Sequence, residues 1–239
     1  MIGIIRREIR AYFYSPAGYV FTGIFWLLGA AFFFLYNILA ASADVTGLFG
    51  NLSYLFMLIV PLLTMRLFSE ERRQRTDMLY FCSPTPLAAV VLGKFLAAML
   101  MLLIALLGTG VYLAILVRRA TLAWGLVAAN YLGFLLLGGC YIAVGVLMSA
   151  LTESQVTAAV LTLAANMLLQ LAEMSSGSLV TPYLPFLPSL MKLLALNSRF
   201  ASMATGVIRP TDVGYFVVFA GVLLALTVYI LARRRRTRR

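Results

Sequence analysis

Charged side chains are concentrated in one short run, FSEERRQRTDMLYFCSPTPLAAVVLGK, at residues 68–94. Residues 66–77 hold seven charges, although the whole 239-residue chain has only 19 basic and 8 acidic residues. Charges of both signs within one short helical segment suit contact with a soluble protein. The seven are Arg66, Glu70, Glu71, Arg72, Arg73, Arg75 and Asp77.

The residue types that most enzymes need are missing. There is no histidine, which removes the commonest general base and metal ligand. The two cysteines, Cys82 and Cys140, are not at metal-ligand spacing. Gly93-Lys94 lacks the rest of a phosphate-binding loop, because Ala88 and Phe95 stand where glycine and Ser/Thr are needed. We therefore expect a protein that is not an enzyme and binds no metal or cofactor itself, so its energy must come from a partner or a gradient.

A second polar set follows a helical spacing: Thr162, Asn166, Gln170 and Glu173 are separated by steps of four, four and three. These steps place all four on one face of a helix. Polar groups are costly in hydrocarbon, so the stripe should face either a protein interface or a hydrated pathway. The spacing leaves both interpretations open.

The composition is that of a multi-pass membrane protein. The chain is 63% hydrophobic and 11% charged, whereas globular domains have about 25% charged residues. The first apolar stretch, of about 24 residues, is too long for the 7–15 residues of a leader peptide, so we expect a retained span. Read against the roughly 20 residues that cross a bilayer, the apolar stretches predict six spans, at about 17–40, 51–68, 88–117, 122–150, 155–175 and 212–232.

The basic residues predict the orientation, because Lys and Arg beside spans favour the cytoplasmic side. Six spans place both termini on one side, with 14 of the 19 basic residues, including the six arginines of the 233–239 tail. We therefore expect both termini inside the cell. The net charge of +11 lies beside membrane spans, which favours anionic lipid as a partner and not nucleic acid.

Several elements flank the spans. Residues 1–15 have an amphipathic helical pattern, predicted to lie in the headgroup layer, with Ile2, Ile5, Ile9, Tyr12 and Phe13 on one face and Arg6, Arg7 and Arg10 on the other. Pro61 should bend the second span. Residues 176–211 contain four prolines and an apolar middle, which predicts an external re-entrant or surface-lying helical segment.

Residues 66–86 are predicted to form a rigid cytoplasmic elbow between the second and third spans. Ser69 can cap a short helix whose acidic first turn suits the helix dipole, and Ser83-Pro84-Thr85-Pro86 ends the segment. A solvated loop that only sets topology is the alternative.

These residues resemble a known family. The run from Glu70 through Thr76, Leu79, Ser83-Pro84 and Leu92-Gly93-Lys94 is similar to the signature of ABC-2 type permeases. The segment NSRFASMATGVIRPTDVGYF, at 197–216, resembles the stretch before the last span in the gliding-motility-type branch. The chain departs from the signature at Arg75, where glycine is usual, and at Asp77, where glutamate is usual.

The resemblance implies one all-α domain over residues 1–239, the permease subunit of an exporter in a bacterial or archaeal cytoplasmic (inner) membrane. Implied partners are a cytoplasmic ABC ATPase that carries ATP and Mg, a second permease copy in a homodimer or a related permease, and an accessory subunit. Spans two and five would line the pathway, with Pro61 as a hinge. The ATPase-coupling residues would be Ser69, Glu70, Glu71, Arg72, Arg73, Arg75, Thr76 and Asp77. A gradient-driven transporter or channel is the alternative function.

Overall fold

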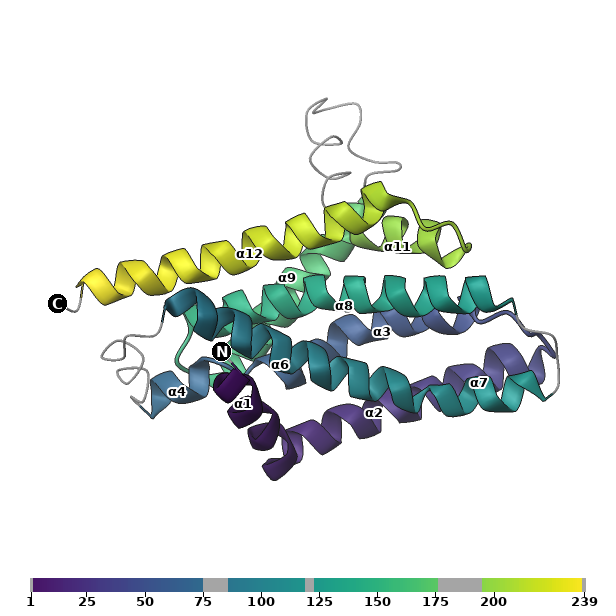
Figure 1. Ribbon diagram of the computed structural model, residues 1–239, viewed down its shortest axis with the longest axis horizontal. Helices are drawn as coiled ribbons and strands as arrows, with labels where there is room; N and C mark the ends of the chain where they lie inside the picture. Colours follow the sequence, from purple (N-terminus) through teal and green to yellow (C-terminus); the bar gives the residue numbers. More distant parts are fainter. Residues whose placement is uncertain (1, 75–85, 119–122, 176–194, 238–239) are drawn as a thin grey trace.

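The computed structural model describes residues 2–74, 86–118, 123–175 and 195–237, which form helices and no strands (Figure 1). The helices are α1 (Ile2–Tyr14), α2 (Pro16–Phe33), the π-helix η1 (Phe34–Leu39), α3 (Thr46–Thr64), α4 (Ser69–Arg73), α6 (Leu87–Gly108), α7 (Gly110–Val117), α8 (Trp124–Leu151), α9 (Gln155–Ser175), α11 (Leu196–Ala204) and α12 (Pro210–Thr237). The predicted all-α class is confirmed for this part of the chain.

Five helical stretches are long and apolar enough to cross a membrane: Pro16–Leu39, Thr46–Arg73, Leu87–Val117, Trp124–Leu151 and Pro210–Arg234. They match five of the six predicted spans and give the chain its multi-pass membrane character. The fifth predicted span corresponds to α9, whose apolar part, Gln155–Leu171, is shorter. The count of six therefore stays a prediction.

Helix α8 forms the centre of the bundle. In its most apolar stretch 78% of the residues are buried, against 22% in α12 and 28% in the first span. Two glycines of α8 allow close packing. A Cβ at Gly145 would lie 2.2 Å from the Thr64 hydroxyl of α3, and one at Gly138 would lie 2.4 Å from Leu102 of α6. The outer faces of α2 and α12 are left for lipid or another chain.

Both termini lie at the same end of the bundle (Figure 1). Near the C-terminus, the Arg234 guanidinium donates to the carbonyl oxygens of Ala150 and Leu151 at the end of α8, at 2.9 and 3.2 Å. Arg72 of α4 also donates to the Ala150 carbonyl. Helix α4 and the end of α12 therefore meet beside the turn between α8 and α9. That this end is cytoplasmic remains a prediction.

The predicted external segment is described only from residue 195, and residues 176–194 lie outside the described part. Helix α11 packs on α8, α9 and α3, with Leu196, Phe200 and Met203 buried. It ends before Gly206, whose φ of +92° suits glycine. The described end of the segment is thus a packed helix, and its position relative to a membrane stays a prediction.

Candidate functional site

Six charged side chains converge where α1, α4 and α6 meet, and we name this cluster the charged junction. Together with uncharged neighbours they line a pocket of about 310 Å³. Three are basic and three acidic, so the cluster as a whole is neutral. Its members are Arg7, Glu8, Arg66, Glu70, Glu71 and Lys94.

Lys94 is the buried centre of the charged junction. Its side chain is 1% exposed, and its Nζ lies 3.0 Å from the Glu8 carboxylate, 3.0 Å from that of Glu71 and 2.6 Å from the Leu67 carbonyl oxygen. The ammonium group donates hydrogen bonds to Glu8 and to the Leu67 carbonyl oxygen, and its contact with Glu71 is an ion pair. One side chain thereby ties α6 to α1, to α4 and to the α3–α4 connection.

The glycine before Lys94 lets α1 approach α6 closely. A Cβ at Gly93 would lie 3.0 Å from Cγ2 of Ile4 on α1, which is tighter than ordinary van der Waals contact. Gly93-Lys94 of the sequence motif therefore has a structural role. Gly93 leaves room for α1, and Lys94 binds the Glu8 carboxylate of α1.

The inner face of α1 presents Glu8 and Tyr12, one helical turn apart and both buried. The Tyr12 hydroxyl donates to the Leu63 carbonyl oxygen near the end of α3, at 2.7 Å. Burial raises the pKa of the Tyr12 phenol well above its usual range, the Glu8 carboxylate raises it further, and Arg66 opposes them. Tyr12 therefore stays protonated and able to donate.

Glu8 was missed by the sequence reasoning, which treated α1 only as an apolar and a basic face. One signal could have found it: Glu8 is the only acidic residue among the first 43. Arginines alone would be enough to set the membrane orientation of this helix. A single carboxylate among them is therefore expected to bind a specific partner.

Arg66 fixes the corner between α1 and α2. Its guanidinium donates to the Ala11 carbonyl oxygen at 3.1 Å and to the Ser15 hydroxyl. It also lies 5.4 Å from the centre of the Tyr12 ring and 3.8 Å from the Glu70 carboxylate. The last distance is the longest ion pair in the charged junction, so Glu70 is held less tightly than Glu71.

The prediction that Ser69 caps α4 is wrong. The N-cap residue is Phe68, and the capping oxygen comes from Ser149 of α8, which accepts from the Phe68 and Ser69 N–H groups at 3.0 and 3.2 Å. Ser69 is fully buried and donates to the Met65 carbonyl oxygen. A neighbouring helix supplies the cap because α4 starts directly against α8.

The charges of α4 divide into an inner and an outer pair. Glu71 and Arg72 point inward, with side chains 13% and 12% exposed. Glu71 binds Lys94 and Arg7. Arg72 binds the Ala150 carbonyl and the Glu153 carboxylate. Glu70 is 38% exposed, and Arg73 is exposed and makes no ion pair with the described residues. The inner pair attaches α4 to the bundle; of the outer pair, Arg73 is exposed and Glu70 is partly exposed beside Arg66.

The remaining predicted coupling residues cannot be placed, because Arg75, Thr76 and Asp77 lie outside the described residues. The described helix of the elbow is α4, five residues long. Pro61 lies inside α3, which continues through it and ends at Thr64. Its role as a hinge stays a prediction.

The predicted polar stripe lies on α9, and its inner half is buried. Thr162 and Asn166 are completely buried. The Thr162 hydroxyl donates to the Ala158 carbonyl of its own helix at 2.7 Å. The Asn166 amide has no hydrogen-bond partner among the described residues, which is costly for a buried polar group.

The outer half of the stripe holds α11. The Glu173 carboxylate accepts from the backbone N–H groups of Asn197, at 3.0 Å, and Ser198, so it caps the first turn of α11. The Asn197 amide donates to the Gln170 side chain and, at 2.9 Å, to the Tyr141 hydroxyl of α8. For Gln170 and Glu173 the structure shows a helix contact, and Asn197 is the partner that sequence reasoning missed.

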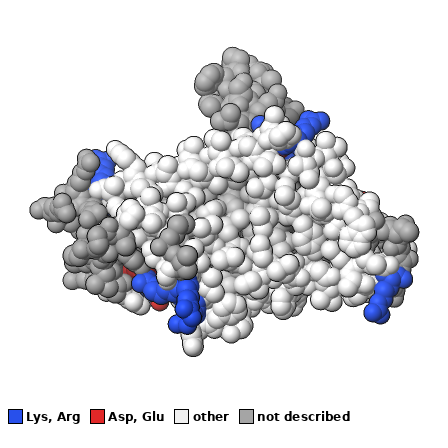
Figure 2. Space-filling model, in the orientation of Figure 1, with Lys and Arg blue, Asp and Glu red and all other residues white. Residues whose placement is uncertain are grey.

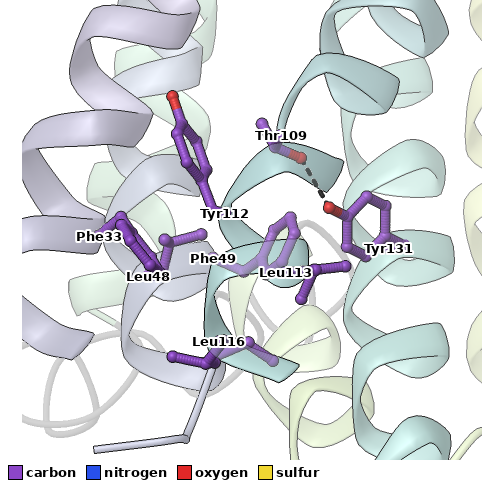
Figure 3. Close-up of a pocket in the computed structure, with 9 residues that line it drawn as sticks. Phe33, Leu48, Phe49, Thr109, Tyr112, Leu113, Leu116 and Tyr131 are labelled. Carbon is purple, nitrogen blue, oxygen red and sulfur yellow. Dashed lines mark hydrogen bonds between the residues drawn. The ribbon is translucent and has the colours of Figure 1, made fainter. Parts of the chain in front are cut away.

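A second pocket lies at the opposite end of the bundle and is lined mainly by aromatic and aliphatic side chains (Figure 3). It surrounds Thr109, where the helix breaks between α6 and α7, and the Thr109 hydroxyl lies 2.7 Å from that of Tyr131. Its volume is about 10 Å³, about the room that one water molecule needs. The charged junction is therefore the stronger candidate site.

Among the described residues no group of three or more His, Cys, Asp or Glu side chains could hold a metal ion. No protein-family model matches the chain, and no curated protein matches it. The resemblance to ABC-2 permeases therefore remains a prediction from the sequence motifs.

Proposed function

We propose that this chain is the transmembrane permease subunit of an ABC-2 type exporter, driven by ATP hydrolysis in a separate cytoplasmic ATPase. The observation that carries the proposal is the division of charge on α4. Glu71 and Arg72 attach α4 to the bundle, while Arg73 is exposed and Glu70 partly exposed at the end where both termini lie. A short helix held firmly and charged on its outer side suits docking on a soluble protein.

The contacts of α4 offer a route for movement into the bundle. Motion imposed on α4 reaches α1 through Glu71 and Arg7, α6 through Lys94, and α8 through Arg72 and Ser149. Because these contacts are short and largely buried, α4 cannot shift without displacing at least one of the three helices. Pro61, in the last turn of α3, is where we expect that helix to bend.

In this proposal ATP and Mg are bound by the partner, and two permease copies, or this chain and a related permease, assemble in a bacterial or archaeal cytoplasmic membrane with both termini inside. Spans two and five line the pathway. The unpaired amide of Asn166 supports a role for the stripe beyond packing, because a buried polar group without a partner is retained at a cost. Thr162 lies one turn away.

The alternative is a gradient-driven transporter, which needs an ionisable group available inside the membrane. Two acidic residues near the outer ends of spans have other partners. Glu173 caps α11, and Asp212 pairs with Arg199 at 3.1 Å. These contacts favour the ATP-driven proposal.

The test is capture of the ATPase from native membranes with the tagged full chain, followed by mass spectrometry and a nucleotide-binding assay on the captured protein. The double reversal Glu70→Lys with Arg73→Glu should reduce ATPase capture at least tenfold and leave membrane insertion unchanged. Because Glu70 pairs with Arg66, the single reversal Arg73→Glu, at an exposed site, should also reduce capture, with the melting temperature unchanged. The matched control, Arg118→Glu, changes an exposed arginine at the opposite end and should leave capture intact. The proposal is wrong if the wild-type chain captures no ATPase, or if the double reversal captures as much as the wild type.

A further inference from the structure

The outward face of α1 is both basic and aromatic. Arg6 and Arg10, one helical turn apart, are exposed and make no ion pair with any residue that the structure describes. Like charges at this spacing repel each other unless an anion lies between them. Beside them Phe13 is 43% exposed and Tyr14 90% exposed. This face therefore lacks a counter-charge and an apolar cover.

The orientation of α1 brings this face to the membrane surface. Figure 1 shows α1 lying steeply across the direction of the long helices, at the end of the bundle where both termini lie. If the long helices cross the bilayer, α1 lies along its surface. Figure 2 shows Lys and Arg side chains at this end of the visible face, as well as basic groups at the opposite end. Tyr19, exposed on the first turn of α2, continues the aromatic surface through an edge contact with Phe13.

We propose that Arg6, Arg10, Phe13, Tyr14 and Tyr19 form a binding surface for the anionic headgroups of the surrounding phospholipid leaflet. A guanidinium group binds phosphate through paired N–H donors, and tyrosine and phenylalanine rings are suited to the boundary between headgroups and acyl chains. Charge complementarity selects anionic over zwitterionic lipid. This surface needs no ATPase, so the inference stands independently of the proposed function.

The bound lipid would also support the charged junction. Arg7 lies between Arg6 and Glu8 in the sequence, and its guanidinium binds Glu71 of α4. Glu8, on the inner face, binds Lys94. Holding the outer face of α1 in the headgroup layer therefore holds its inner face against α4 and α6. We expect anionic lipid to raise the melting temperature of the chain more than zwitterionic lipid does.

The test is native mass spectrometry of the purified full chain in detergent micelles, titrated with phosphatidylglycerol and, separately, with phosphatidylcholine. At about 1 kcal/mol for each basic residue near an anionic surface, the double substitution R6Q/R10Q should weaken phosphatidylglycerol binding roughly 30-fold. The control R118Q/R209Q removes two exposed arginines elsewhere and should leave it nearly unchanged.

Three results of the lipid titrations would overturn the inference: equal binding of the two lipids, equal losses in the two double variants, or displacement of phosphatidylglycerol by inorganic phosphate at similar concentration. The second would mean that net charge alone attracts the lipid, and the third that the site takes free phosphate. If R6Q/R10Q does not fold, each single substitution should weaken binding roughly fivefold. Loss of ATPase capture in these variants with lipid binding unchanged would assign the face to the ATPase and also overturn the inference.

Discussion

The two ends of the bundle each contain a break between consecutive helices. Different kinds of hydrogen-bond donor bind the backbone carbonyl groups at the two breaks. Between α3 and α4, the carbonyl oxygens of Leu63 and Leu67 accept from Tyr12 and from the charged Lys94. Between α6 and α7, the Ala105 carbonyl accepts from the neutral indole N–H of Trp26 at 2.9 Å. Carbonyl groups freed from a helix must find donors within a membrane protein.

The neutral break follows from one displaced hydrogen bond. The Thr109 N–H donates to Leu106 at 3.0 Å, so the Ala105 carbonyl loses its helical partner and Trp26 of α2 replaces it. In return, the Tyr112 hydroxyl of α7 donates to the Trp26 carbonyl at 2.7 Å. The Tyr112 ring stacks on Phe33 at 5.2 Å between centroids (Figure 3). The contacts that the described residues make at this break are therefore between neutral groups.

The comparison shows that charge is not needed to close a helix break. At the charged junction the charge joins several segments at once, because the single Lys94 ammonium group binds two carboxylates and a carbonyl oxygen. The same arrangement makes that end sensitive to substitution, since removing the Lys94 charge takes the buried partner from both Glu8 and Glu71. A neutral donor leaves behind at most one unpaired carbonyl.

The largest effect should follow from Lys94→Met, which keeps the length of the side chain and removes the charge. The Glu8 and Glu71 carboxylates would lose their buried partner, and breaking a buried ion pair costs about 3–5 kcal/mol. We expect a large fall in melting temperature, measured by intrinsic fluorescence of the purified chain in detergent. Adding Glu8→Gln should recover part of the loss, whereas Arg209→Gln, at an exposed site, should change little. A melting temperature near that of the wild type for Lys94→Met would contradict the buried role of Lys94.

An intermediate effect is expected at the neutral end from Gly108→Ala. A Cβ there would lie 2.4 Å from the rigid Trp26 indole and displace it from the Ala105 carbonyl. Overpacking of this kind costs about 1–3 kcal/mol. Gly110, two residues later, has open space around its Cβ position, so Gly110→Ala is the matched control and should be near neutral. Thermal unfolding of the two variants side by side measures the difference, and equal losses would contradict the Trp26 contact.

Sequence periodicity and composition were enough to predict the all-helical class and the five stretches that are long and apolar enough to cross a membrane, because these depend on residues near one another in the chain. Helix α9 and its polar face were predicted for the same reason. The partners of that face were not, since Asn197 comes 24 residues after Glu173 and lies on a separate helix. The spacing of residues along a helix predicts which of them share a face, but it does not predict which other helix packs against that face.

The charged junction illustrates the same limit. The run at 66–77 was recognisable, but which of its charges face inward depends on Lys94 and on Glu8, which are 86 residues apart. Glu70 and Glu71 are equivalent by spacing and charge, yet their side chains are 38% and 13% exposed. Only the packing of α1 against α6 separates the buried carboxylate from the more exposed one.

The smallest effect tests the capping of α4, where the sequence pointed to the wrong serine. The Ser149 hydroxyl accepts from two backbone N–H groups, of Phe68 and Ser69, and donates to the Met65 carbonyl at 3.2 Å. The Ser69 hydroxyl only donates to that same carbonyl. Loss of an N-cap costs about 0.5–2 kcal/mol, so Ser149→Ala should lower the melting temperature more than Ser69→Ala does.

Each of the two serine variants removes one hydroxyl group from a fully buried side chain. A difference between their melting temperatures therefore does not come from a difference in side-chain size or burial. After Ser69→Ala the Met65 carbonyl still has Ser149 as a donor, whereas after Ser149→Ala the Phe68 and Ser69 N–H groups have no substitute acceptor among the described contacts. Hydrogen exchange should accordingly speed up at these two amides in Ser149→Ala alone. If Ser69→Ala is the more damaging change, α4 is held by its own serine, and its attachment to α8 through the cap would have to be abandoned.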